Sequence, residues 1–150
     1  MILNPENVYF TTAKGPISMV EAISISESGP VEIACLSDDK KTVVYKELSK
    51  ECFIPKNKYL YKVTIDDASL YLDKDCEILT DKGISVKIAY MIHGISLMKD
   101  VPEMDVMKID MDKLYGSAIL QNIDHTAYNL PSYNVRVPGF YPIINDIFMV

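Results

Sequence analysis

The chain has 150 residues, of which 49% are hydrophobic and 24% charged, and its 15 Lys and Arg residues against 21 Asp and Glu residues give a formal net charge of −6. A chain of this size fits one domain, 1–150, that folds without a metal or a disulfide framework. The acidic balance argues against nucleic acid as a partner, and there is no apolar run of the roughly 18 to 20 residues that span a bilayer.

Short apolar segments rich in Val, Ile, Leu and Tyr alternate with turn residues along the chain, a pattern typical of β structure. Polar or glycine-containing turns predict hairpins, the first at 13–16, where Gly15 and Pro16 adjoin. Neither a repeat nor a linker divides the chain. The predicted strands, in chain order, are 7–12, 17–25, 31–36, 42–48, 59–65, 69–72, 77–80, 84–89, 117–123, 133–137 and 143–150.

The segment 98–113 departs from this pattern because it alternates Met, Asp, Val and Lys, with one proline at Pro102. It fits either an edge strand with an acidic face in water or a short helix that begins near Pro102. Its methionines favour core or edge packing, and an adaptable contact surface is the alternative. These methionines are Met98, Met104, Met107 and Met111.

Cysteine and histidine are too sparse to indicate a metal or catalytic site. The three cysteines, Cys35, Cys52 and Cys76, lack CxxC spacing, so we expect reduced thiols and no zinc. His93 and His125 are isolated from any nucleophile pattern and are expected in a turn and in a loop. We predict no cofactor.

Acidic residues gather near Cys76. Asp73, Asp75 and Glu77 alternate as strand neighbours do, and with 66–67 they could bind calcium. A solvated acidic face is the favoured interpretation, because no glycine-containing ligand loop is present. The carboxylates of Asp75 and Glu77 are expected to raise the pKa of Cys76, which predicts a packed and unreactive thiol.

Tyrosines recur in several predicted strands, where they fit either a protein interface or the ordinary core of a small β domain. They include Tyr59, Tyr61, Tyr71, Tyr128, Tyr133 and Tyr141.

In this order, the strands and turns resemble the Hint domain, the mainly β horseshoe of hairpins that inteins share with hedgehog autoprocessing domains. The start, 1–23, is similar to the N-terminal stretch of that family, with Met1 where the family has its Cys or Ser nucleophile. Residues 70–86 resemble its central Thr-x-x-His motif, with Asp73 for the Thr and Cys76 for the His. Residues 133–150 resemble its C-terminal hairpin, without the final His and Asn after Val150.

The resemblance implies four splicing positions, Met1, Asp73, Cys76 and Val150, and none carries the required chemistry. A thioether has no proton to lose and cannot form an ester. Asp73 would oppose a developing oxyanion, a thiol with an ordinary pKa near 8.5 is a poor replacement for His, and Val150 has no amide to cyclise.

We therefore expect an inactive Hint domain that serves as a structural or protein-interaction module, a component of a larger assembly such as a phage particle. The segment 98–113 is its first candidate contact, because inteins accept insertions there. The signal-free start predicts a location in the cytoplasm or in an assembly, away from membranes.

Two other functions remain open from the sequence. One is an autoprocessing element in mutated or trimmed form, with Met1 and the end at Val150 as introduced changes. The other is an acidic regulator that binds a basic surface in a salt-sensitive way.

Overall fold

The structure is a computed structural model that describes residues 1–38, 43–65, 67–79, 85–88, 104–108, 116–145 and 147–148. These residues are mainly β, as predicted. The strands are β1 (Ile2–Leu3), β2 (Tyr9–Thr12), β3 (Gly15–Ser18), β4 (Val31–Ser37), β5 (Val43–Leu48), β6 (Phe53–Ile65), β7 (Ala68–Leu72), β8 (Glu77–Leu79), β9 (Ser85–Lys87), β10 (Met104–Lys108), β11 (Gly116–Val135), β12 (Phe140–Ile144) and β13 (Ile147–Phe148); the helices are α1 (Met19–Ser26) and the 3₁₀ turn η1 (Lys50–Cys52).

The predicted hairpins between neighbouring strands are confirmed. The first turn places Gly15 at a φ of 110°, a conformation that glycine adopts without strain. The β4–β5, β6–β7 and β8–β9 hairpins also pair as antiparallel neighbours. The β6 strand begins at Phe53, earlier than predicted, and continues past Pro55.

One predicted strand is wrong, because the segment 17–25 becomes the helix α1 after Ser18. The Ser18 hydroxyl caps the helix by accepting a hydrogen bond from the Glu21 backbone N–H at 3.1 Å. The buried residues Met19, Ala22 and Ser26 recur at helical spacing. The alternation of Ile and Ser at 23–26 imitates a strand, and the cap decides for the helix.

The predicted strands 117–123 and 133–137 are, up to Val135, parts of one long strand, β11, so this prediction is also corrected. Pro131 does not interrupt β11, since it stays in register opposite Asn57. A register irregularity lies between Ile123 and Ala127. The backbone of His125 is therefore in β11 and not in the predicted loop.

Within the segment 98–113, residues Met104–Lys108 form the strand β10, which holds Met104 and Met107. This decides for a strand over a helix there. Among the described strands, β10 pairs with β11 along its length and with β13 at Lys108 alone, so over most of its length it fits the predicted edge strand. The rest of the segment, with Met98 and Met111, lies outside the described residues.

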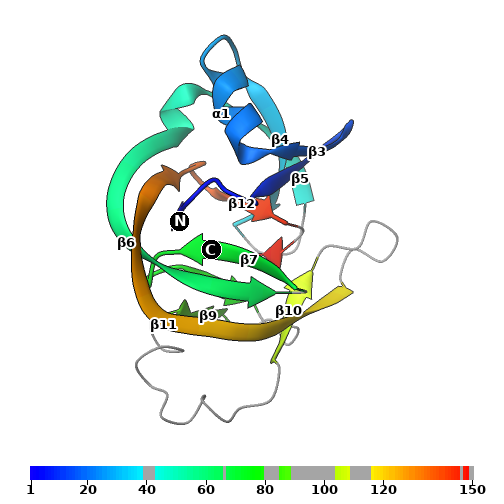
Figure 1. Ribbon diagram of the computed structural model, residues 1–150. Helices are drawn as coiled ribbons and strands as arrows, with labels where there is room; N and C mark the ends of the chain where they lie inside the picture. The colour runs from blue at the N-terminus through cyan, green and yellow to red at the C-terminus, as the bar shows by residue number, and fades with distance from the viewer. Residues whose placement is uncertain are drawn as a thin grey trace.

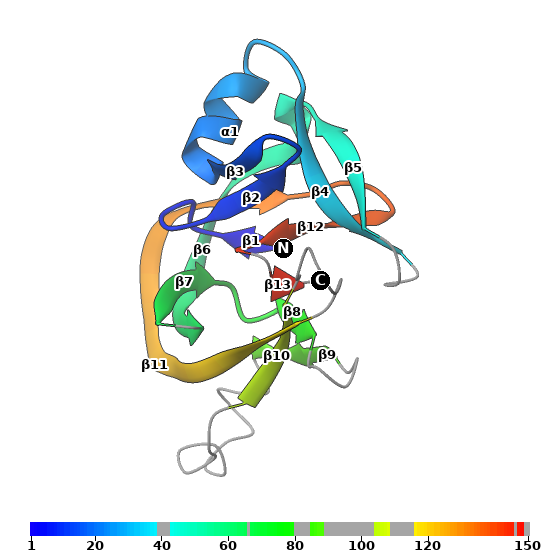
Figure 2. The same ribbon diagram turned by 90° about the vertical axis from the view of Figure 1, so that its right-hand side faces the viewer.

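The strands of the described part form an 11-stranded sheet and the separate β8–β9 hairpin. The two long curved strands, β6 and β11, link an upper group made of β2–β5 and α1 to a lower group made of β7–β10 (Figures 1 and 2). Neighbours run in the order β1, β7, β6, β11, β10, β13, β12, β2 and β3, with β4 and β5 joined through β12. The short β1 also pairs with β11, and Figure 2 shows it at the centre, where both groups meet.

The hydrophobic core surrounds this central strand. Leu3 is fully buried, and it packs in one cluster with Phe10 of β2, Leu48 of β5 and Leu72 of β7. The core therefore holds the first residues of the chain in a fixed place.

Within the described residues no helix has the length and apolar character needed to cross a membrane.

Candidate site at the first residue

The first residues are held between β7 and β11. Ile2 is opposite Asn134 of β11, and Leu3 is opposite both Tyr133 of β11 and Leu72 of β7. The carbonyl of Met1 accepts a hydrogen bond from the Val135 N–H at 2.9 Å. Pairing on both sides leaves the start of the chain little freedom.

Two asparagines complete this clamp. The Asn134 side-chain oxygen accepts a hydrogen bond of 3.0 Å from the amino nitrogen of Met1. Asn4 is buried, donates to the Pro131 carbonyl at 2.7 Å, and accepts from the Glu6 N–H at 3.0 Å. Sequence reasoning missed both asparagines. For Asn134 the available signal was its place within the predicted strand 133–137, where asparagine is disfavoured unless its side chain has a partner. Asn4 lies outside every predicted strand and gave no such signal.

The turn after β7 brings Asp73 and Cys76 to the same place. The Ile2 carbonyl accepts a hydrogen bond from the Asp73 N–H at 3.0 Å, and the Cys76 thiol donates weakly to it at 3.6 Å. The thiol also lies 3.0 Å from Asp73 Oδ1. Three of the four residues singled out in the sequence, Met1, Asp73 and Cys76, therefore meet at β1. Val150 lies outside the described residues.

The interpretation of Asp73, Asp75 and Glu77 as one solvated strand face is wrong. Residues 73–76 form a turn, and β8 begins only at Glu77. Asp73 is buried, at 6% exposure, while Asp75 is exposed. The described residues contain no group of three His, Cys, Asp or Glu side chains placed to hold a metal ion, and Asp66 lies outside them.

Cys76 is a buried thiol, as predicted, at 1% exposure. Burial is the largest cause that raises its pKa, and the charge of Asp73 and its hydrogen bond to the thiol raise it further. The amino terminus acts in the opposite direction. The prediction that Asp75 and Glu77 raise this pKa named the wrong carboxylates, because the turn points Asp73 at the sulfur. The thiol stays protonated at neutral pH.

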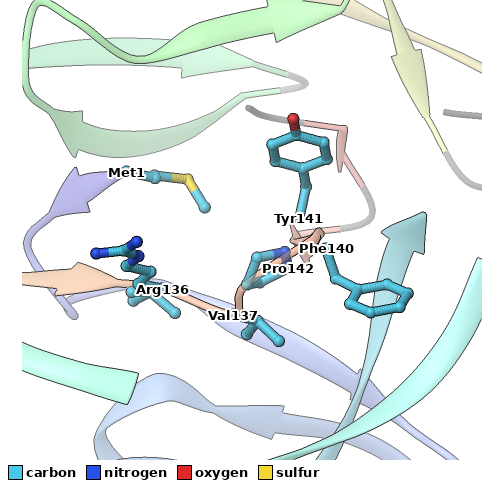
Figure 3. A pocket seen from close by; sticks show the side chains of 7 residues that line it. Met1, Arg136, Val137, Phe140, Tyr141 and Pro142 are labelled. Atoms are coloured by element: carbon cyan, nitrogen blue, oxygen red, sulfur yellow. The ribbon is translucent and has the colours of Figure 1, made fainter. Parts of the chain in front are cut away.

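A pocket of about 140 Å³ lies beside the first residue. Figure 3 shows the Met1 side chain on one side of it and Tyr141 and Pro142 of β12 on the other. The exposed Arg136, which sequence reasoning did not single out, also lines the pocket. The start of the chain and the connection from β11 to β12 thus adjoin one small cavity.

The chemistry available at these described residues is limited. Met1 supplies a thioether, which has no proton and is not a nucleophile for acyl transfer. Cys76 directs its proton to a buried carboxylate, so it is neither a thiolate nor a good proton donor. His93 lies outside the described residues, and of His125 the structure describes the backbone alone.

The similarity of this chain to known proteins is found in solved structures and not in sequence. No family model and no curated protein matches the sequence. The bacterial intein-like domain from Clostridium thermocellum, known from a solution structure, matches with a TM-score of 0.64 at 13% identity, over 100% of this chain and 98% of that chain. The TvoVMA intein matches with a TM-score of 0.63 at 12% identity, over 99% and 96%. The gp41-1 intein matches with a TM-score of 0.52 at 17% identity, over 97% and 94%.

These matches extend over nearly the whole chain. The chain has the Hint fold, the fold of inteins and intein-like domains. The fold class predicted from the sequence is confirmed.

Proposed function

We propose that this chain is a Hint domain without splicing activity, which serves as a structural or protein-interaction module. The observation that carries the proposal is the set of side chains around β1. A thioether occupies the position that resembles the nucleophile of the family, and a thiol paired with a buried carboxylate occupies the positions that resemble its Thr and His.

The arrangement supports inactivity at each chemical step. An acyl shift needs a nucleophile beside the scissile carbonyl, and Met1 does not provide one. Departure of the amide nitrogen needs a proton donor, and the pKa of Cys76 is raised by burial and by Asp73. Stabilisation of an oxyanion needs donors or positive charge, and the carboxylate of Asp73 adds negative charge instead.

A fusion protein tests this proposal directly. One reporter domain is joined before Met1 and another after Val150, and the purified protein is incubated at neutral pH with and without a thiol. Intact mass spectrometry is expected to find an unchanged mass after days. Release of either reporter from the unsubstituted sequence would overturn the proposed inactivity.

A restored variant tests whether the assigned positions are right. Met1→Cys, Asp73→Thr and Cys76→His together return the side chains that the family pattern has, and thiol-dependent release of the N-terminal reporter is expected. Met1→Cys alone is the matched control, because it keeps the Asp73 and Cys76 pair. Equal release from the control would mean that this pair still supports the reaction. Near-UV circular dichroism checks that each variant is folded.

The segment 98–113 remains a proposed partner contact. Its described part, β10, has its backbone paired with β11, so contact there would use side chains. Binding of an identified partner protein to the unsubstituted chain is compared with its binding to a variant that carries Met104→Thr and Met107→Thr. Weaker binding of the variant supports the contact, and equal binding contradicts it.

A further inference from the structure

The first half of β6 is exposed on both faces. All residues from Ile54 to Tyr59 are exposed, up to 66% for Tyr59, while Phe53 and Leu60 on either side are buried. In Figure 1, β6 is the outermost ribbon on the left, with β11 immediately inside it. This stretch is paired on one side with β11, and β7 reaches only Tyr61 on the other side.

The direction of the backbone groups follows from the register. In β11, the Val135 N–H donates to the Met1 carbonyl, and the Pro131 carbonyl accepts from the Asn4 side chain. The backbone N–H and C=O groups of odd-numbered residues at this end of β11 therefore point toward β1. Backbone groups alternate in direction along a strand, so even-numbered groups of β11 face β6. Ser132 is opposite Lys56, which means that even-numbered groups of β6 are the ones bonded to β11.

The odd-numbered groups of β6 point the other way. Tyr61 faces Leu72 of β7, and the register from Phe53 to Tyr61 has no irregularity. The N–H and C=O groups of Asn57 and Tyr59 therefore point to the same side as those of Tyr61, beyond the end of β7. Among the described strands, none pairs with them there.

The charge of this edge is opposite to that of the whole chain. Residues 53–62 contain three lysines and no carboxylate, and the facing stretch 127–135 has no charged residue, although the net charge is −6. Lys56 and Lys58 are two residues apart, so they lie on the same face of the strand, and both are exposed. The open edge is therefore locally basic.

A second copy of this chain fits the edge poorly. Edge lysines and prolines are features by which proteins prevent pairing between identical strands, and Pro55, Lys56 and Lys58 stand here together. An antiparallel second copy would bring lysines of both copies near one another, which is unfavourable. A strand with acidic side chains would instead meet these lysines with opposite charge.

We propose that the edge of β6 at 55–59 binds an extended acidic segment of another protein by strand addition. The segment continues the line of β7, bonds to the outward groups of Asn57 and Tyr59, and places its carboxylates beside Lys56 and Lys58. This proposal does not depend on the absence of splicing activity, because the edge contains none of the residues Met1, Asp73 and Cys76.

The probe for the test is a synthetic extended peptide in which Thr or Val alternates with Glu. The control is the same peptide with Lys in place of each Glu. Amide chemical shifts of the isotopically labelled chain are followed during titration. The acidic peptide is expected to shift the amides of 56–60, with weaker binding at higher salt, and the basic peptide is expected to leave them unchanged.

Two sets of variants separate charge from backbone pairing. Lys56→Glu with Lys58→Glu is expected to weaken binding of the acidic peptide by about tenfold or more and to create binding of the basic one. Asn57→Pro removes an outward N–H and is expected to weaken binding, while Asn57→Ala keeps the N–H and retains it. The urea midpoint of each variant checks its folding, and the reversal of charge preference does not depend on Asn57→Pro folding.

The proposal is overturned by equal binding of both peptides, by shifts confined to other strands, or by equal binding of Asn57→Pro and Asn57→Ala when both are folded. Amide shifts at 56–60 that depend on protein concentration without peptide would assign the edge to a second copy. That outcome also overturns the acidic partner.

Discussion

The two halves of β6 have the same neighbour on one side and differ on the other. From Tyr61 to Ile65 the strand lies between β11 and β7, and Val63 and Ile65 are buried. From Ile54 to Tyr59 it has β11 alone, and every residue is exposed. One strand thus contains both a closed segment inside a sheet and an open edge.

The difference shows that strand propensity alone does not decide how exposed a side chain is. Tyr59 and Tyr61 are the same residue type on the same face, yet Tyr59 is 66% exposed and Tyr61 packs against the core. The packing of β7 beside Tyr61 accounts for this. Substitutions in the closed half should therefore affect stability, and those in the open half should affect binding.

The largest expected effect on stability is in β7, the strand that pairs with the closed half of β6. Leu70 of β7 is 1% exposed and opposite Val63, so Leu70→Ala should lower the free energy of unfolding by about 2 to 5 kcal/mol through lost burial and a cavity. Tyr59→Ala is the control and should change it by no more than about 0.5 kcal/mol. Urea denaturation measures both, and similar losses would contradict the contrast between the two halves.

A proline placed in each half tests the hydrogen bonding. Tyr61→Pro removes the N–H that faces Leu72 and should cost about 2 kcal/mol or more, because a ladder bond is lost and a carbonyl is left without its partner. Asn57→Pro removes an N–H that faces outward and should cost less. The difference between the two denaturation midpoints is the measurement, and a larger loss at Asn57 would mean that the register argument has the wrong parity.

Asn4, which bonds to β11, and Asn57, on the open edge of β6, can be compared in the same way. Asn4 is buried and bonds to Pro131 and Glu6, so Asn4→Ala should lower stability by about 1 to 3 kcal/mol by leaving backbone groups unsatisfied. Asn57→Ala on the open edge should be close to neutral. Thermal unfolding of the two variants compares them, and equal melting temperatures would show that the Asn4 bonds add nothing net.

The smallest effect on stability at neutral pH concerns Cys76, which lies in the turn after β7. Burial and Asp73 raise the pKa of Cys76 in the folded chain above its ordinary value, so the unfolded chain loses the thiol proton first. The contribution of Cys76 to stability is then complete below about pH 9 and declines as the pH rises further.

Asp73→Asn should lower this pKa without returning it to the ordinary value, because burial is the larger cause. Thiolate absorbance during an alkaline titration of the folded protein measures the shift. Native Cys76 should resist alkylation at pH 8 in both proteins, and rapid alkylation in the unsubstituted chain would contradict its burial.

Local patterns in the sequence predicted much of this fold. The Gly15 turn and the hairpins β4–β5, β6–β7 and β8–β9 follow from alternating apolar residues bounded by turn residues. The failures occurred where local patterns conflict. Alternating Ile and Ser imitated a strand where the Ser18 cap begins the helix α1. Pro131 lies in the gap between the predicted strands 117–123 and 133–137, but its nitrogen faces away from β6 and β11 continues through it.

For the site, the residue types alone show which side chains occupy the positions that resemble the splicing residues, and they exclude a nucleophile at Met1. The spatial arrangement of the strands is needed to show that Asp73 points at the Cys76 sulfur, that Asn4 and Asn134 hold the first residues, and that half of β6 is open. Each of these depends on strands far apart in the sequence, and long-range pairing leaves no local signal in the residues that it brings together.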